Sequence, residues 1–284
     1  MRYLSLLIMA VIMALQAPAW GAEILVLQSS RSQAYEKALR GFRSTCKLTE
    51  QTLVMTDFAE IDVQRMVREE RPRLVLAVGD KALEACRKVR EVPVVSMLAL
   101  SLNLGKHSPG NVGGVAMTVA PEQYFRLFDA LGAGRVGVLY NPKKTGLYLK
   151  RALAESRQRG LKLVAEPVHD PRELQSKLEM MKESVDALWM LPDSTVVTTV
   201  NLEAFLLFSM AHNVPTVTFT CEYLREGAAA ALDIDPLDMG VQAGELALSL
   251  LRGGTSRKVP VLDPRKVQQH NNESVLRSLG LKLP

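Results

Sequence analysis

Apolar residues occur along this chain in short uninterrupted runs, separated by longer stretches in which apolar residues recur at helical spacing. Runs rich in Val, Ile and Leu without polar alternation are typical of strands buried on both faces of a parallel sheet. The intervening stretches predict amphipathic helices that cover the sheet, so the pattern predicts an α/β fold. The runs are 24–27, 52–55, 74–78, 92–97, 112–117, 136–140, 161–165, 187–191, 215–219 and 229–234; two helical stripes are Tyr35, Leu39, Phe42 and Cys46, and Tyr124, Leu127, Phe128 and Leu131.

The N-terminal segment has the layout of a secretory signal peptide. One cation, Arg2, precedes an apolar stretch, 6–15, which is too short for a comfortable membrane span of about 20 residues. Both Ala17-Pro-Ala19 and Ala19-Trp-Gly21 fit the small-x-small cleavage rule, and no cysteine lies nearby to carry a lipid. We take 1–22 as the signal peptide and expect a periplasmic protein, with an uncleaved membrane anchor as the alternative.

The rest of the chain predicts two lobes. The alternation of predicted strand and helix repeats through about five strands, is interrupted at the glycine-rich segment 131–134, and then repeats through about five more. Without the signal, about 262 residues remain (284 − 22), a size at which one hydrophobic core tends to divide. We therefore expect a first lobe over 23–133 and a second over 134–223, each a parallel sheet flanked by helices.

Charge and cysteine content narrow the class of protein. Lys and Arg number 35 and Asp and Glu 30, a formal net charge of +5, or +4 once the signal with its one Arg is removed. The basic residues are scattered among acids without interleaved aromatics, so we expect no nucleic-acid partner. The widely spaced Cys46, Cys86 and Cys221 give no disulfide framework, although one bridge is compatible with an oxidising compartment. Cys46 and Cys86 lie on apolar helix faces and are interpreted as core.

Motifs for catalysis, cofactors and metals are missing. The sequence has no G-x-x-x-x-G-K-[ST], no G-x-G-x-x-G after the first strand and no G-x-S-x-G. The glycine-rich segment 109–114 is interpreted as a turn. The histidines have no histidine partner at i+3 or i+4, so we expect no metal site and no cofactor. They are His107, His169, His212 and His270.

Polar residues follow most of the predicted strands, in segments 28–32, 79–81, 98–101, 141–145, 192–195 and 220–223. In open parallel sheets, ligands bind outside the carboxyl ends of the strands. Ser, Thr, Asp and Asn are also favoured helix N-caps, so each segment has a structural explanation too. We prefer capping for Asp80 and ligand contact for Asp193. Arg31 is either a solvated loop residue or a partner for a ligand carboxylate.

A set of segments resembles one known family in order and spacing. The segments are 24–28 (I-L-V-L-Q), 72–79 (P-R-L-V-L-A-V-G), 111–115 (N-V-G-G-V), 135–142 (R-V-G-V-L-Y-N-P), 191–197 (L-P-D-S-T-V-V), 227–240 leading into 242–244 (Q-A-G), 251–254, 259–260 and 279–284. With these the mature chain resembles the periplasmic substrate-binding proteins of the ABC transporter substrate-binding family that includes tryptophan- and phenylalanine-binding members. Two departures, an absent D-P-V-like turn at 98–103 and Gly113 in place of a common Thr, leave the ligand open.

The resemblance implies a type I periplasmic binding protein fold, with two α/β lobes joined by several crossings of a hinge. It implies that part of 224–255 returns to the first lobe and that 256–284 packs on the second. It also implies a non-enzymatic monomer, the solute-binding component of an ABC-type import system, which captures an amino acid or related carboxylate and delivers it to a membrane permease. The cleft residues would be Gln28, Ser29, Ser30, Arg31, Gly79, Asp80, Tyr140, Asn141, Asp193, Ser194, Phe219, Thr220 and Tyr223.

Within that cleft we expect Asp193 to accept from a ligand ammonium, and groups at 29–30 and 79–80 to hold a carboxylate. Tyr140, Phe219 and Tyr223 either flank an apolar part of the ligand or pack within the lobe. Two other functions stay open. One is a periplasmic sensing partner of a membrane receptor or sensor kinase, and the other is an α/β enzyme with Asp193 as its visible candidate.

Overall fold

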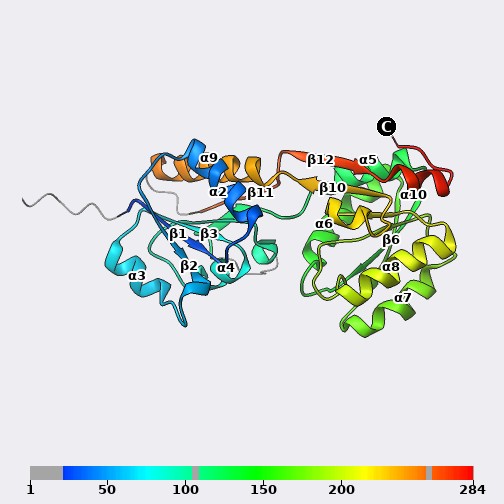
Figure 1. Ribbon diagram of the computed structural model, residues 1–284, viewed down its shortest axis with the longest axis horizontal. Helices are drawn as coiled ribbons and strands as arrows, with labels where there is room; N and C mark the ends of the chain where they lie inside the picture. Colours follow the sequence, from blue (N-terminus) through cyan, green and yellow to red (C-terminus); the bar gives the residue numbers. More distant parts are fainter. Residues whose placement is uncertain (1–21, 104–108, 254–257, 284) are drawn as a thin grey trace, which may run out of the picture.

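The computed structural model describes residues 22–103, 109–253 and 258–283, which form two α/β lobes side by side along the long axis of the molecule (Figure 1). Each lobe contains a six-stranded sheet with helices on both faces, which confirms the predicted fold class. None of the described helices is long and apolar enough to cross a membrane. Residues 1–21 of the expected signal peptide (1–22) lie outside the described residues, so the signal peptide stays a prediction.

The first lobe is built on an all-parallel sheet in the order β11-β5-β4-β3-β1-β2. The strands β1 and β3 are buried at every position, as their unbroken apolar runs predict. The strands are β1 (Ile24–Gln28), β2 (Glu50–Val54), β3 (Leu74–Val78), β4 (Val94–Met97), β5 (Val112–Val115) and β11 (Val261–Leu262), and the helices are α2 (Gln33–Thr45), α3 (Val63–Glu70), α4 (Asp80–Cys86) and α9 (Pro236–Arg252), with the 3-10 turns η1 (Met55–Asp57) and η2 (Leu100–Asn103).

The second lobe repeats the plan in the order β12-β10-β9-β8-β6-β7, with β12 alone antiparallel to its neighbour. The strands are β6 (Arg135–Tyr140), β7 (Lys162–Pro167), β8 (Ala187–Trp189), β9 (Thr216–Thr218), β10 (Ala230–Ile234) and β12 (Val267–Asn271). The helices are α5 (Pro121–Ala130), α6 (Gly146–Arg159), α7 (Leu174–Met181), α8 (Thr199–His212) and α10 (Glu273–Ser278), with the 3-10 turns η3 (Pro171–Glu173) and η4 (Cys221–Leu224).

The helix α5 belongs to the second lobe, which corrects the boundary predicted at 133–134. Its aromatic face surrounds the fully buried indole of Trp189 on β8, with a ring-centroid distance of 4.8 Å to Tyr124 and 5.8 Å to Phe125. Helical spacing predicts that α5 is amphipathic, but not which sheet its apolar face covers. The first crossing between the lobes therefore lies between β5 and α5, at 116–120.

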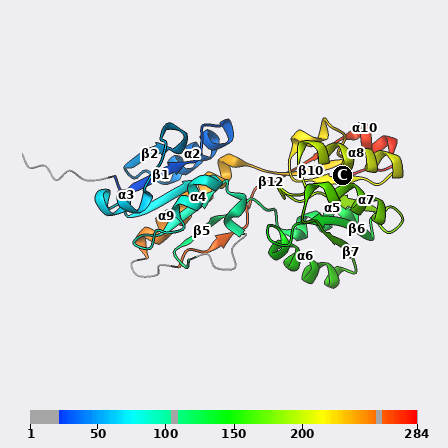
Figure 2. The same ribbon diagram turned by 90° about the horizontal axis from the view of Figure 1, so that it is seen from below.

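Two further crossings join the described parts of the lobes. The chain returns to the first lobe between β10 and α9, and goes back to the second between β11 and β12. Thus, within 224–255, α9 lies in the first lobe while β10 stays in the second. Within 256–284, β11 lies in the first lobe while β12 and α10 lie in the second (Figure 2).

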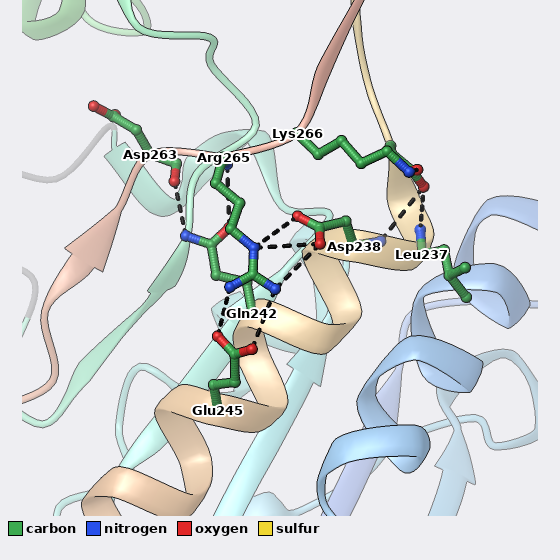
Figure 3. Close-up of polar contacts among 8 residues, drawn as sticks. Leu237, Asp238, Gln242, Glu245, Asp263, Arg265 and Lys266 are labelled. Carbon is green, nitrogen blue, oxygen red and sulfur yellow. Dashed lines mark hydrogen bonds and ion pairs between the residues drawn. The ribbon is translucent and has the colours of Figure 1, made fainter.

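A polar network holds the third crossing against the start of α9 (Figure 3). The Arg265 guanidinium contacts the carboxylates of Asp238 at 3.1 Å and Glu245 at 2.7 Å. The Gln242 side chain donates to the backbone carbonyl of Asp263 at 2.9 Å and accepts from the Arg265 N–H at 3.3 Å. Because every one of these α9 side chains belongs to the first lobe, the crossing strand is anchored on that side of the hinge.

The helices α2 and α9 pack at backbone distance. An added Cβ at Gly41 would overlap the carbonyl oxygen of Leu237, and one at Gly240 would overlap that of Ala38. Glycine at both positions lets the helices approach closely, and Phe42 and Met239 are buried in the same core layer. This contact attaches the returning helix to the first lobe.

Gly240→Ala tests the contact. The helices must separate to admit the methyl group, so we expect the free energy of unfolding to fall by about 1–3 kcal/mol. Gly146→Ala, at the first residue of α6, is the matched control, because its Cβ would meet neighbours only at 3.9 Å. Urea denaturation followed by circular dichroism measures both variants. Equal stability of the two would contradict the close packing of α2 on α9.

Candidate functional site

The carboxyl edges of the two sheets face each other. From the carboxyl end of β5 the chain crosses to the second lobe, and from the carboxyl end of β10 it crosses to the first. Since β1, β3 and β4 run parallel to β5, and β6, β8 and β9 run parallel to β10, the loops that follow all these strands lie on the inward sides of their lobes. The predicted site residues are in these loops.

The loop after β1 is tied to the loop after β3. The Gln28 side chain is buried, and its Nε2 donates to the backbone carbonyl of Ser30 at 2.8 Å. The Ser29 hydroxyl accepts from the backbone N–H of Ala82 at 2.9 Å, inside the first turn of α4. Gln28 and Ser29 therefore support the wall, whereas Ser30 is half-buried and reaches its surface.

Gly79 allows a tyrosine to close over this loop. Its φ of +89° favours glycine, and its N–H donates to the carbonyl of Met97 at 3.0 Å. An added Cβ would collide with the hydroxyl of Tyr35, which comes from α2. Burial, and secondarily the charge of Asp80, raise the pKa of Tyr35. The sequence pattern assigns Tyr35 only to an apolar helix stripe. Sequence reasoning therefore missed Tyr35 as a residue of this wall.

Asp80 caps a neighbouring turn instead of its own helix. The N-cap of α4 is Gly79, and the Asp80 carboxylate accepts from the backbone N–H groups of Ser101 at 2.7 Å and Leu100 at 3.3 Å, at the start of η2. Asp80 therefore acts as a cap, as the capping interpretation predicts, but it caps η2 and not the start of its own helix α4. The residue is exposed, so the carboxylate also faces solvent at the inward edge.

Arg31 has a carboxylate partner from its own lobe. Its two terminal nitrogens each lie 2.6 Å from an oxygen of Asp57, which follows β2. The hydrogen bond from Arg31 lowers the pKa of Asp57, and both side chains are exposed. The arrangement matches the solvated-loop alternative for Arg31 in this conformation.

The Asp193 carboxylate is enclosed within the second lobe, unlike the expectation that it faces a ligand. The residue is 1% exposed. One oxygen accepts from the Asn141 N–H at 2.8 Å and the Thr145 hydroxyl at 2.6 Å, and the other accepts from the Thr195 N–H at 2.9 Å. A buried carboxylate with three donors is stabilised without a ligand, and it fastens the loop after β8 to the loop after β6.

Asn141 belongs to the same internal network. It is 8% exposed, and its amide nitrogen donates to the Thr195 hydroxyl at 3.1 Å. By contrast, Ser194 is exposed and its hydroxyl lies 2.7 Å from the Nζ of Lys144. Tyr140, the last residue of β6, is half-buried. Thus Tyr140, Lys144 and Ser194 reach the surface of this wall, while Asn141 supports it.

The loop after β9 adds an aromatic pair. The rings of Phe219 and Tyr223 meet edge to face with centroids 5.6 Å apart, and both side chains are half-buried against the core of the second lobe. The Thr220 hydroxyl accepts from the Glu222 N–H at 3.4 Å and begins η4. Burial, and secondarily the charge of Glu222, raise the pKa of Tyr223. The pair packs within its lobe and keeps part of its ring surface accessible.

Comparison with known proteins identifies the type of molecule to which this chain is similar. The family model described as ABC transporter substrate binding protein matches residues 55–284. The chain is 21% identical over 177 residues to a tyrosine-binding protein of Clostridioides difficile (strain R20291), a match that covers 61% of this chain and 51% of that protein. The chain thus spans about half the length of this curated relative.

Solved structures show the same fold. One is the ligand-free, open structure of a substrate-binding protein with adhesive properties from Clostridium difficile, with a TM-score of 0.71 and 19% identity. Another is an ABC domain from Streptococcus pneumonia in complex with L-Trp, with a TM-score of 0.63 and 20% identity. Each match covers 93% of this chain and 96% of the other. At this identity the likeness establishes the type I periplasmic binding protein fold.

Asp193→Ala tests whether the buried carboxylate supports the second lobe. Three buried donors would lose their acceptor, so we expect the free energy of unfolding to fall by about 2–4 kcal/mol. Ser194→Ala, one residue away and exposed, should change it by less than about 0.5 kcal/mol. Denaturant unfolding of both variants provides the measurement. An Asp193→Ala protein as stable as the Ser194→Ala protein would show that the network does not support the lobe.

Proposed function

The chain belongs to the family of ABC transporter substrate-binding proteins, and we propose that it is the periplasmic solute-binding subunit of an import system. In this role it captures an amino acid between its lobes and delivers it to a membrane permease. Family members bind their solutes without converting them, so the chain is not an enzyme. The observation that carries the proposal is the pair of polar carboxyl edges facing each other across a hinge of three crossings.

An amino acid suits the charges on the two walls. On the first lobe, the exposed Asp80 carboxylate uses two of about four acceptor positions on Leu100 and Ser101, which leaves room for a ligand ammonium. On the second lobe, Lys144 has the neutral Ser194 hydroxyl as its hydrogen-bond partner, and no described acid forms an ion pair with it. Its ammonium can therefore take a ligand carboxylate. A zwitterion held at both ends would draw the lobes together.

An aromatic side chain is the best candidate for the rest of the ligand. Phe219 and Tyr223 on one wall, and the half-buried Tyr35 on the other, offer ring surface to a planar group. The relatives support the same class, because one is named for tyrosine and another is a complex with L-Trp. We therefore propose L-tyrosine, L-phenylalanine and L-tryptophan as the first solutes to test.

Thermal shift and calorimetry with the mature protein test this function. A solute that binds only the folded protein must raise the melting temperature, so an aromatic L-amino acid should do so. We expect Asp80→Asn and Lys144→Gln each to weaken its affinity at least about tenfold, the equivalent of about 1.4 kcal/mol. Asp129→Asn and Lys182→Gln are the matched controls, since both lie at the carboxyl ends of helices, away from the inward edges.

Three results would count against the proposal. Absence of any shift across the amino acids would remove the proposed ligand class. Equal affinity of the four variants would remove the proposed charge pairing while leaving the ligand class intact. Uptake of the labelled amino acid by cells lacking this protein tests the import step, and unchanged uptake would contradict it.

A further inference from the structure

Three side chains that commonly ligate metals meet at the end of β9 and along the β10–β12 ladder. They are Cys221 of η4, Asp233 of β10 and His270 of β12. One potential ligand atom from each, a sulfur, a carboxylate oxygen and an imidazole nitrogen, lies within 4.8 Å of the other two. The residues are distant in sequence and come from three elements, so spacing rules along the chain do not reveal the group.

The strand register explains the meeting. In the antiparallel ladder, Asp233 lies opposite Gln268 and His270 lies opposite Ala231, which places the Asp233 and His270 side chains diagonally on one face. The neighbouring strand β9 pairs with β10 as far as Thr218 opposite Ala231. The chain then turns into η4, and the Cys221 N–H lies 3.5 Å from the Asp233 carboxylate.

The side chains of the three residues are partly accessible and could turn towards a metal ion. All are half-buried, Cys221 is a free thiol, and the imidazole of His270 has no hydrogen-bond partner among the described residues. The other two thiols, Cys46 and Cys86, are buried in the first lobe. A catalytic cysteine would pair with the imidazole alone, whereas here the carboxylate of Asp233 and the imidazole both lie close to the sulfur, since the three ligand atoms are all within 4.8 Å of one another.

We propose that Cys221, Asp233 and His270 bind one divalent transition-metal ion, with Zn²⁺ the best match. Sulfur, nitrogen and oxygen together form the mixed donor set that a borderline ion accepts. Ligand atoms around tetrahedral zinc lie about 3.3–3.7 Å apart, given bond lengths of about 2.0–2.3 Å. Side-chain rotations that move the ligand atoms by about 1 Å would bring the observed group to that spacing. Three protein ligands leave the fourth position open to water or a solute.

The proposed metal site lies next to the aromatic pair and to the second crossing between the lobes. The turn η4 carries Tyr223 and follows Phe219, and Asp233 directly precedes Ile234, where the chain crosses to the first lobe. A bound ion would therefore fasten η4 to the strand that leads into the hinge. The metal proposal does not depend on which solute the protein carries.

A cobalt titration of the full mature chain, prepared metal-free and without a histidine tag, tests the site. We expect one Co²⁺ per molecule with the near-ultraviolet absorption of a cobalt–thiolate bond, and displacement of the cobalt by one equivalent of Zn²⁺. Cys221→Ser should abolish that absorption. Competition with a chromophoric chelator should show at least about tenfold weaker Zn²⁺ binding in Cys221→Ser, Asp233→Asn and His270→Gln.

His169→Gln and Cys46→Ala are the controls, because neither residue is near the group, and both should bind the ion as the unsubstituted protein does. Melting curves of each metal-free variant distinguish loss of a ligand from loss of the fold. No cobalt–thiolate absorption in the unsubstituted protein would overturn the proposal. So would Zn²⁺ affinity that is unchanged in folded Cys221→Ser and His270→Gln proteins.

Discussion

Neither lobe is complete without a segment that returns to it from the other. The helix α9 reaches the first lobe only after β10 of the second, and it packs on α2 through contacts that require glycine at 41 and 240. The strand β12 reaches the second lobe only after β11 of the first. Because the described chain leaves both sheets at their carboxyl ends, this exchange turns the two polar edges towards each other. The facing walls of the candidate site and the hinge between the lobes both follow from this exchange of segments.

The strands were the most predictable part of the fold. Each apolar run overlaps an observed strand. Burial on both faces requires an unbroken apolar sequence, as in β1 and β3, whereas the edge strands β2 and β7 are only partly buried. The two remaining strands were missed for different reasons. The strand β11 has only two residues, and β12 (V-Q-Q-H-N) is a polar, antiparallel edge strand whose position depends on pairing with β10. The lobe to which α5 belongs is set by its packing around Trp189, a contact between residues distant in sequence.

The candidate site was predictable as a set of loops but not as a set of side-chain roles. Parallel topology places residues after strands at one edge, which is why Asp80, Tyr140 and Ser194 lie on the inward walls. Whether a polar group faces the ligand or the lobe depends on donors supplied by other loops, as Asn141, Thr145 and Thr195 do for Asp193. The same limit applies to Tyr35 and to the group of Cys221, Asp233 and His270, which only the fold brings together.

Small-angle X-ray scattering with and without solute tests most directly the claim that the lobes close on a bound molecule. The experiment uses the mature protein and the amino acid that raises its melting temperature most, at a concentration shown by calorimetry to saturate the site. Closure about the three crossings predicts a smaller radius of gyration in the presence of the solute. An unchanged radius of gyration at saturation would contradict the account, because the two walls would then not meet on the ligand.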